Sequence, residues 1–161
     1  MMSRKLVAYF SASGVTRLVS GRLAEAIGAD LYEIKPAQTY SDNDLNWMDQ
    51  TTRATVEQKD PSSRPALADR DANIGGYDII YLGFPIWWYI APRIIQTFLE
   101  SYDFSGKTLV LYATSGGSGF GKTVDELKPG ISPSAKIIEW RLLNGGPSAA
   151  DLAKWSASLN L

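Results

Sequence analysis

A short turn rich in hydroxyl groups follows the first apolar run of the chain, residues 6–10. The turn consists of Ser11, Ala12, Ser13, Gly14, Val15 and Thr16. Its hydroxyl groups can donate hydrogen bonds, and the glycine allows a tight turn before a helix. The first amides of a helix lack internal partners and its dipole favours negative charge, so this turn predicts an anion site. The alternative is that Ser13 only caps the helix.

A second turn carries aromatic side chains after the apolar run at residues 79–83. The turn consists of Pro85, Ile86, Trp87, Trp88 and Tyr89. Adjacent side chains on an extended segment point in opposite directions, so we expect at least one tryptophan to be exposed. Neighbouring exposed aromatic rings indicate a surface for a ligand or a partner. The alternative is that all three rings pack on neighbouring helices.

A third turn, after the apolar run at residues 109–112, consists mostly of glycine and serine. Its residues are Thr114, Ser115, Gly116, Gly117, Ser118 and Gly119, with Phe120 directly after them. Glycine allows the backbone to approach a flat ligand closely. Turns at the carboxyl ends of parallel strands share one edge of the sheet, where ligands bind. The three turns together suit a ligand with a phosphate at one end and a planar ring at the other, such as flavin mononucleotide (FMN).

The third turn also matches a different nucleotide-binding pattern. Residues 116–123 fit G-x-x-x-x-G-K-[ST], the P-loop of nucleoside triphosphatases, between a strand and a helix. A P-loop enzyme also needs an acidic residue that holds magnesium at the end of another buried strand. The strands that end near Phe84 and Leu143 lack such a residue. The nucleoside triphosphatase is therefore a remote alternative, and we expect Lys122 to be a solvated residue at the start of a helix.

Composition excludes several kinds of chemistry. The chain has 161 residues, of which 45% are hydrophobic, and this predicts a single domain over residues 1–161. It contains no cysteine and no histidine, which excludes disulfides, thiolate nucleophiles, iron–sulfur ligation and a Ser-His-Asp triad. We therefore expect no metal site and no catalytic side chain. Any reaction must depend largely on a cofactor.

Charge and hydropathy predict a cytoplasmic protein. The net charge of -1 leaves no electrostatic signature for nucleic acid or for an anionic membrane. The apolar stretch after the positively charged residues 1–5 is shorter than the core of a signal peptide. The longest apolar region, residues 79–91, is interrupted by Gly83 and Pro85 and is too short to span a bilayer. We expect neither nucleic-acid nor membrane partners.

Strand-like and helix-like patterns alternate along the chain. We expect strands at about residues 5–10, 31–34, 78–84, 107–113 and 136–143. We expect helices at about residues 16–27, 44–58, 121–128 and 149–159, and a further one that begins at Pro92. This alternation predicts an α/β fold with a three-layer, doubly wound, parallel five-stranded sheet in the order 2-1-3-4-5.

The segment at residues 37–76 is the least informative part of the sequence. It contains one helical pattern, followed by a loop marked by Pro61 and Pro65. One interpretation makes it a lid over the ligand, formed with the polar and aromatic residues Asp42, Asp44, Trp47, Arg53 and Arg64. The other, which we favour, makes it a poorly formed connecting helix.

The three turns resemble those of the flavodoxin family. Ser11-x-Ser13-Gly14-x-Thr16 is similar to the family's phosphate loop, Ser/Thr-x-Thr-Gly-x-Thr. Residues 83–88 resemble the tryptophan-bearing loop beside the isoalloxazine ring, in the form found in a bacterial flavodoxin-like subgroup. Residues 114–119 resemble that subgroup's other ring-flanking loop. The resemblance covers the whole chain and implies a flavodoxin-like fold, tight non-covalent FMN binding and low-potential single-electron transfer.

The resemblance also implies roles for individual residues. The phosphate would be held by Ser11, Ser13, Gly14, Val15 and Thr16; the ring would be lined by Pro85, Ile86, Trp87, Trp88 and Tyr89. Its pyrimidine edge would meet Ser115, Gly116, Gly117, Ser118 and Gly119, which follow Thr114. Phe120 is the candidate for the second stacking ring, and a backbone carbonyl near Trp87 would accept a hydrogen bond from the protonated flavin N5 atom.

The resemblance implies partners as well. A flavodoxin exchanges electrons with redox partner proteins, a reductase and an acceptor, and we expect a monomer or a weak dimer. Flavodoxins are usually strongly acidic, whereas this chain is nearly neutral. An FMN-dependent NAD(P)H:quinone reductase or flavin reductase on the same fold is therefore the alternative.

Overall fold

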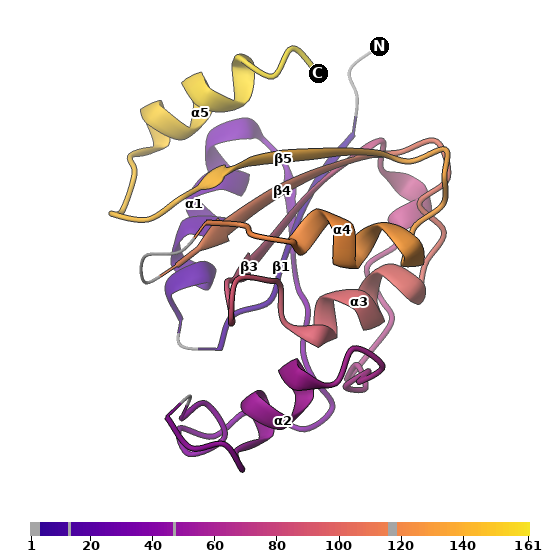
Figure 1. Cartoon of the computed structure of the whole chain (residues 1–161). Helices are drawn as coiled ribbons and strands as arrows, with labels where there is room; N and C mark the ends of the chain where they lie inside the picture. The colour runs from indigo at the N-terminus through magenta and orange to yellow at the C-terminus, as the bar shows by residue number, and fades with distance from the viewer. Residues whose placement is uncertain (1–3, 13, 47, 116–118) are drawn as a thin grey trace.

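A five-stranded parallel sheet with helices on both faces forms the centre of the molecule (Figure 1). The computed structural model describes residues 4–12, 14–46, 48–115 and 119–161. The strands are β1 (Lys5–Tyr9), β2 (Asp30–Glu33), β3 (Ile79–Pro85), β4 (Thr108–Thr114) and β5 (Lys136–Leu142). Their order is β2-β1-β3-β4-β5, which confirms the predicted topology.

Helices cover the two faces of the sheet. They are α1 (Val15–Ile27), α2 (Arg53–Lys59), α3 (Arg93–Glu100), α4 (Thr123–Leu127) and α5 (Ala149–Ala157). Two 3₁₀ turns, Ile74–Gly76 and Lys128–Gly130, accompany them. Helices α1 and α5 lie on one face and α3 and α4 on the other, while α2 lies beyond α3, away from the sheet (Figure 1). Over the described ranges, every helix is too short or too polar to cross a membrane.

The helix predicted over residues 44–58 is wrong in its first half, because α2 begins only at Arg53. Turns occupy most of residues 42–52. Ser41 and Asp44 exchange hydrogen bonds, with each side chain accepting from the other's backbone amide at 2.9–3.1 Å. The Thr52 hydroxyl donates to the carbonyl of Asn46 at 3.0 Å. Such side-chain bonds to the backbone compete with helix formation.

Alternate residues of the central strands enter the two layers of core. Leu6 and Leu82 pack with the residues of α3, whereas Val7 and Tyr81 pack with α1 and α5. This two-sided burial explains the continuous apolar runs of these strands. Because β1, β3 and β4 are parallel neighbours, the three turns that follow them emerge at the same edge of the sheet.

Two buried tyrosines anchor the layer of α1 and α5 through their hydroxyl groups. Tyr81 bonds the Ser156 hydroxyl at 2.6 Å, and Tyr112 bonds the Ser20 hydroxyl at 2.5 Å. Burial raises the pKa of Tyr112, so its hydroxyl stays protonated across the physiological range. The ring of Tyr112 occupies the space beside Gly83, where an added Cβ would lie 2.2 Å from the ring.

We expect Gly83→Ala to destabilise the protein by about 3 kcal/mol, because the new methyl group overlaps a fully buried ring that has no room to move. Thermal unfolding measures the change. Gly21→Ala in α1 is the control, because open space surrounds its Cβ position. That variant should be more stable than the parent protein by about 0.5–1 kcal/mol. Equal stability of the two variants would contradict the packing at Gly83.

Candidate functional site

The three predicted turns meet at one edge of the sheet. Strand β3 pairs with β1 on one side and β4 on the other, so the turns that follow these strands are neighbours. The hydroxyl groups of Thr16 and Thr114 are 2.8 Å apart and connect the first turn to the end of β4. The amide of Ile86 donates to the carbonyl of Thr114 at 2.9 Å. The ends of the strands are therefore held together by contacts among the predicted site residues.

The first turn leads into helix α1, whose N-cap is a glycine. Gly14 is the N-cap of α1, with φ of 98°, and its amide donates to the Ser11 hydroxyl oxygen at 3.0 Å. Val15 is exposed, whereas Thr16 is buried with its hydroxyl directed to Thr114. Ser13 lies outside the described residues. Among its described residues, this turn can offer an anion the first amides of α1 and the hydroxyl proton of Ser11.

The second turn has an unusual backbone. Trp87 and Ile90 exchange two backbone hydrogen bonds, of 2.9 and 3.2 Å, around Trp88 and Tyr89. Trp88 and Tyr89 both adopt left-handed conformations, with φ of 50° and 66°. This is rare for aromatic residues and costs about 1–3 kcal/mol per residue. Such conformations persist only where the surrounding structure enforces them, and they concentrate at functional sites.

The side chains of this turn divide between an exposed and a packed set. Trp88 is 40% exposed and Tyr89 67% exposed, which confirms the prediction that at least one tryptophan is exposed. Trp87 instead packs edge-on against Phe10 and Tyr40, with ring centroids 5.8 and 5.5 Å apart. We call Phe10, Tyr40 and Trp87 the aromatic cluster.

The segment at residues 37–76 holds this cluster in place. The Arg53 guanidinium stacks on the ring of Tyr40, 3.9 Å from its centroid, and pairs with Glu57 at 2.8 Å. The Tyr40 hydroxyl donates to Glu57, and burial is the main cause of the raised pKa of Tyr40. Of the residues named in the lid interpretation, Arg53 thus contacts the cluster and Arg64 pairs with Glu100 at 3.0 Å, while Trp47 lies outside the described residues.

Gln58 of α2 also contacts the second turn. Its buried amide nitrogen, Nε2, donates to the carbonyls of Trp87 and Ala91, each at 2.9 Å. The Trp87 carbonyl therefore already accepts two hydrogen bonds, one from Gln58 and one from Ile90. Within the described residues, no donor contacts the neighbouring carbonyl of Trp88, which makes it the better candidate for an acceptor near Trp87. Nothing in the sequence pattern distinguishes Gln58 from an ordinary helical residue.

The third turn packs against the second. Gly121 has φ of 55°, and a Cβ there would lie 2.2 Å from the carbonyl oxygen of Tyr89. Phe120 is buried and meets the ring of Phe84 edge-on at 6.4 Å, so its ring belongs to the core in this structure. Gly119 is exposed, and the amide of Ser115 donates to the Asn144 side chain at 2.9 Å. Gly116, Gly117 and Ser118 lie outside the described residues.

The residues of the P-loop pattern that the structure describes do not form a phosphate site. Lys122 is exposed and is the N-cap of α4, as predicted. Thr123 is fully buried, and its hydroxyl donates to the carbonyl of Phe120 at 2.5 Å. Because this side chain is fully buried, its hydroxyl oxygen does not face solvent, where a magnesium ion would bind. Across the described part of the chain, no cluster of three acidic side chains offers a metal site either.

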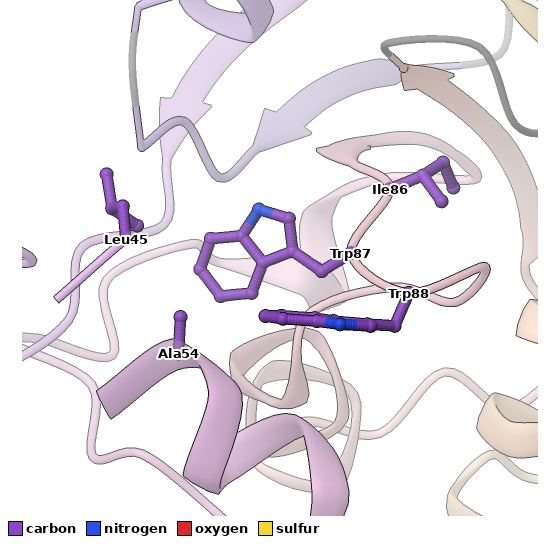
Figure 2. Close-up of a pocket in the computed structure, with 5 residues that line it drawn as sticks. All are labelled: Leu45, Ala54, Ile86, Trp87 and Trp88. Carbon is purple, nitrogen blue, oxygen red and sulfur yellow. The ribbon is translucent and has the colours of Figure 1, made fainter. Parts of the chain in front are cut away.

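An apolar cavity of about 280 Å³ opens beside the second turn. It is lined by Leu45, Ala54, Ile86, Trp87 and Trp88. Figure 2 shows the two indoles between Ile86 and the pair Leu45 and Ala54, which come from the segment at residues 37–76. Apolar walls with aromatic faces suit a planar ring. Sequence reasoning missed Leu45 and Ala54, because ordinary apolar residues in an irregular segment carry no signal.

A second cavity, of about 450 Å³, lies beside the first turn. It is lined by Phe10, Ser11, Ala12, Arg17, Glu33, Lys35, Pro36, Thr39, Tyr40 and Ala68. Arg17 and Glu33 form an ion pair of 2.6 Å at its wall. Phe10 and Tyr40 line this cavity and contact Trp87, which lines the apolar one. The aromatic cluster thus contributes to the walls of both cavities.

The fold and these turns define a doubly wound α/β protein with a candidate site for a ligand that combines an anion and a planar ring. The chain belongs to the flavodoxin family: the family model described as Flavodoxin matches residues 4–159. Among proteins of curated function, none matches this chain.

Solved structures agree with this family. A candidate flavoprotein from Bacteroides eggerthii is 43% identical, with a TM-score of 0.89, and the match covers 99% of each chain. Another from Bacteroides uniformis is 45% identical, with a TM-score of 0.87, over 98% of this chain and 99% of that one. A flavoprotein from Lactobacillus acidophilus, solved in complex with FMN, is 20% identical, with a TM-score of 0.69 over 96% and 99% of the two chains.

We expect Gly121→Ala to disturb the aromatic turn, because its Cβ would overlap the backbone of Tyr89 and its φ is unfavourable for alanine. A loss of about 1–3 kcal/mol in unfolding free energy should accompany a change in the near-ultraviolet circular dichroism of the tryptophans. Gly119→Ala is the matched control, because open space surrounds its Cβ position. If both variants left the tryptophan signal unchanged, the contact between Gly121 and Tyr89 would be irrelevant to the turn.

Proposed function

We propose that this protein binds FMN without a covalent bond and acts as a single-electron carrier between redox proteins. The observation that carries the proposal is the apolar cavity beside the strained turn at Trp88 and Tyr89, at the edge of the sheet where the helix capped by Gly14 also begins. Membership of the flavodoxin family supports it. The same fold holds FMN in the Lactobacillus acidophilus protein.

The described residues fit the two ends of FMN. The start of α1 offers amides and a helix dipole to the phosphate, and Ser11 adds a hydroxyl group. The indoles of Trp87 and Trp88 offer apolar surface to the ring, while the carbonyl of Trp88 can accept a hydrogen bond from its edge. No G-x-G-x-x-G follows the first strand, so the first turn lacks the usual signature for a dinucleotide pyrophosphate.

Bound FMN would supply the electron chemistry, and the side chains would set its surroundings. The cavity walls around Leu45 and Ala54 would exclude water from a ring bound there. Low polarity disfavours an added negative charge on a ligand, as does the nearby phosphate. These residues thereby influence the potential of the bound ring without taking part in a covalent step.

Reconstitution of the apo-protein tests the proposal. We expect FMN to bind more tightly than riboflavin, because each charged hydrogen bond to the phosphate contributes about 1.5–3 kcal/mol. We also expect FAD to bind more weakly than FMN, since the turn has no second phosphate site. Absorbance and fluorescence titrations measure all three ligands. Preference for FAD, or no binding of any flavin, would overturn the proposal.

One observation favours the second candidate function, an FMN-dependent NAD(P)H:quinone or flavin reductase. The segment at residues 37–76 packs on the aromatic cluster and forms part of the cavity wall, as a substrate pocket would require. Consumption of NADPH by the FMN-loaded protein, with and without a quinone, separates the two functions. Rapid turnover would favour the reductase, and absence of turnover the electron carrier.

We expect Ala54→Leu to weaken binding of FMN and riboflavin by about tenfold each, because the larger side chain fills the cavity that the ring would occupy. Val56→Leu is the matched control on the same helix, since Val56 is 55% exposed and lies outside that cavity. Isothermal titration measures both variants. Unchanged affinity in Ala54→Leu would show that the ring binds elsewhere.

A further inference from the structure

A single side-chain amide holds both ends of the aromatic turn. Gln58 is 5% exposed, and its Nε2 donates to the carbonyls of Trp87 and Ala91 at 2.9 Å each. These two carbonyls bracket the segment that contains Trp88 and Tyr89. Both protons of the amide group are therefore used on one turn, so Gln58 fixes the separation and the direction of its ends.

The orientation of the Gln58 amide follows from its surroundings. Its neighbours on this side are two carbonyl oxygens, which require a donor, so Nε2 and not Oε1 faces the turn. The Oε1 atom is consequently buried without a hydrogen-bond partner among the residues that the structure describes. A buried acceptor without a partner is costly. In this orientation, Gln58 bonds both carbonyls of the turn while its own Oε1 accepts no hydrogen bond from a described residue.

Gln58 is itself fixed by a buried arginine. Arg93 at the start of α3 donates from Nη2 to the Gln58 backbone carbonyl at 2.9 Å. Its Nη1 lies 3.2 Å from the Gln96 side chain and 3.3 Å from Glu126 of α4. Arg93 is almost fully buried, and within the described part of the chain its Nε has no hydrogen-bond partner. The position of Gln58 is therefore coupled to three helices, α2, α3 and α4.

The turn needs such a restraint because Trp88 and Tyr89 are in strained left-handed conformations. Freed from Gln58, the turn can relax toward other conformations and carry the indole of Trp88 away from the cavity. A ligand that needs the strained conformation then binds only the fraction of molecules that retain it. Its apparent dissociation constant rises by the inverse of that fraction.

We infer that Gln58 is a positioning residue that holds the aromatic turn in the conformation required by a planar ligand, to which the Trp88 carbonyl is offered as an acceptor. It acts through Trp87 and Ala91 and does not need to touch the ligand. The inference deepens the proposed function and rests on it for the identity of the ligand, FMN. On this inference, the segment at residues 37–76 lines the cavity through Leu45 and Ala54 and also holds the aromatic turn through Gln58.

Gln58→Met tests the inference, with Gln96→Met as the matched control. Both glutamines are buried, both lie in the Arg93 network, and methionine replaces either with an apolar side chain of similar length. Gln96 donates to the carbonyl of Glu126 and has no hydrogen bond to the aromatic turn. Loss of stability is expected in both variants, so the difference between them isolates the effect on the turn.

Three readouts follow the turn. In the apo-proteins, we expect the tryptophan near-ultraviolet signal to change in Gln58→Met and to persist in Gln96→Met. In titrations, Gln58→Met should weaken FMN and riboflavin by the same factor, about tenfold, because the effect concerns the ring and not the phosphate. The midpoint potential of bound FMN should shift in Gln58→Met alone, because the carbonyls near the ring are reoriented.

Opposite results overturn the inference. Equal effects of the two substitutions on the tryptophan signal, ring affinity and potential would make Gln58 an ordinary structural residue. A loss confined to FMN, with riboflavin unaffected, would place the effect at the phosphate. If the parent protein binds no flavin, the proposed function fails, and the tryptophan signal of the apo-proteins still decides whether Gln58 holds the turn.

Discussion

The arrangement of the whole molecule depends on a parallel sheet that is buried on both faces. Because side chains alternate along β1, β3 and β4, the chain must supply one apolar layer from α1 and α5 and another from α3 and its neighbours. At the centre of the sheet, close packing leaves no space for a side chain at Gly83, because the ring of Tyr112 lies against it. This rigid centre delivers three turns to one edge of the sheet, where the candidate site forms.

The site itself depends on contacts between segments that are distant in sequence. The Thr16 and Thr114 hydroxyls join the first turn to β4, Gly121 meets the backbone of Tyr89, and Gln58 holds Trp87 from a segment outside the sheet. The contacts made by Gly121 and Gln58 restrain the aromatic turn, in which Trp88 and Tyr89 adopt strained left-handed conformations. A flavin site on this edge would therefore be preorganised before the ligand arrives, which reduces the entropy lost on binding.

Three features of the candidate site have surroundings that the sequence did not predict. Phe120 was expected as a second stacking ring, whereas the structure buries it against Phe84, and the Thr16 hydroxyl faces Thr114. Both residue types allow either role, and only the competing partner decides between them. The segment at residues 37–76 was expected to be mainly a connecting helix. Local bonds from Ser41, Asp44 and Thr52 shorten that helix and leave irregular backbone around the cavity.

The sequence by itself determined the strand order, the location of the three turns and the exposure of a tryptophan, because these follow from local hydrophobic periodicity and turn chemistry. The resemblance to the flavodoxin family was likewise visible in the sequences of the three turns. Only the tertiary structure decided that Leu45 and Ala54 line the cavity of the candidate site and that Gln58 contacts its aromatic turn. Their contribution comes from what lies opposite them across a cavity or a hydrogen bond. Such long-range contacts leave no periodic pattern in the sequence, because they join residues of the segment at 37–76 to residues of the second turn that are distant in the chain.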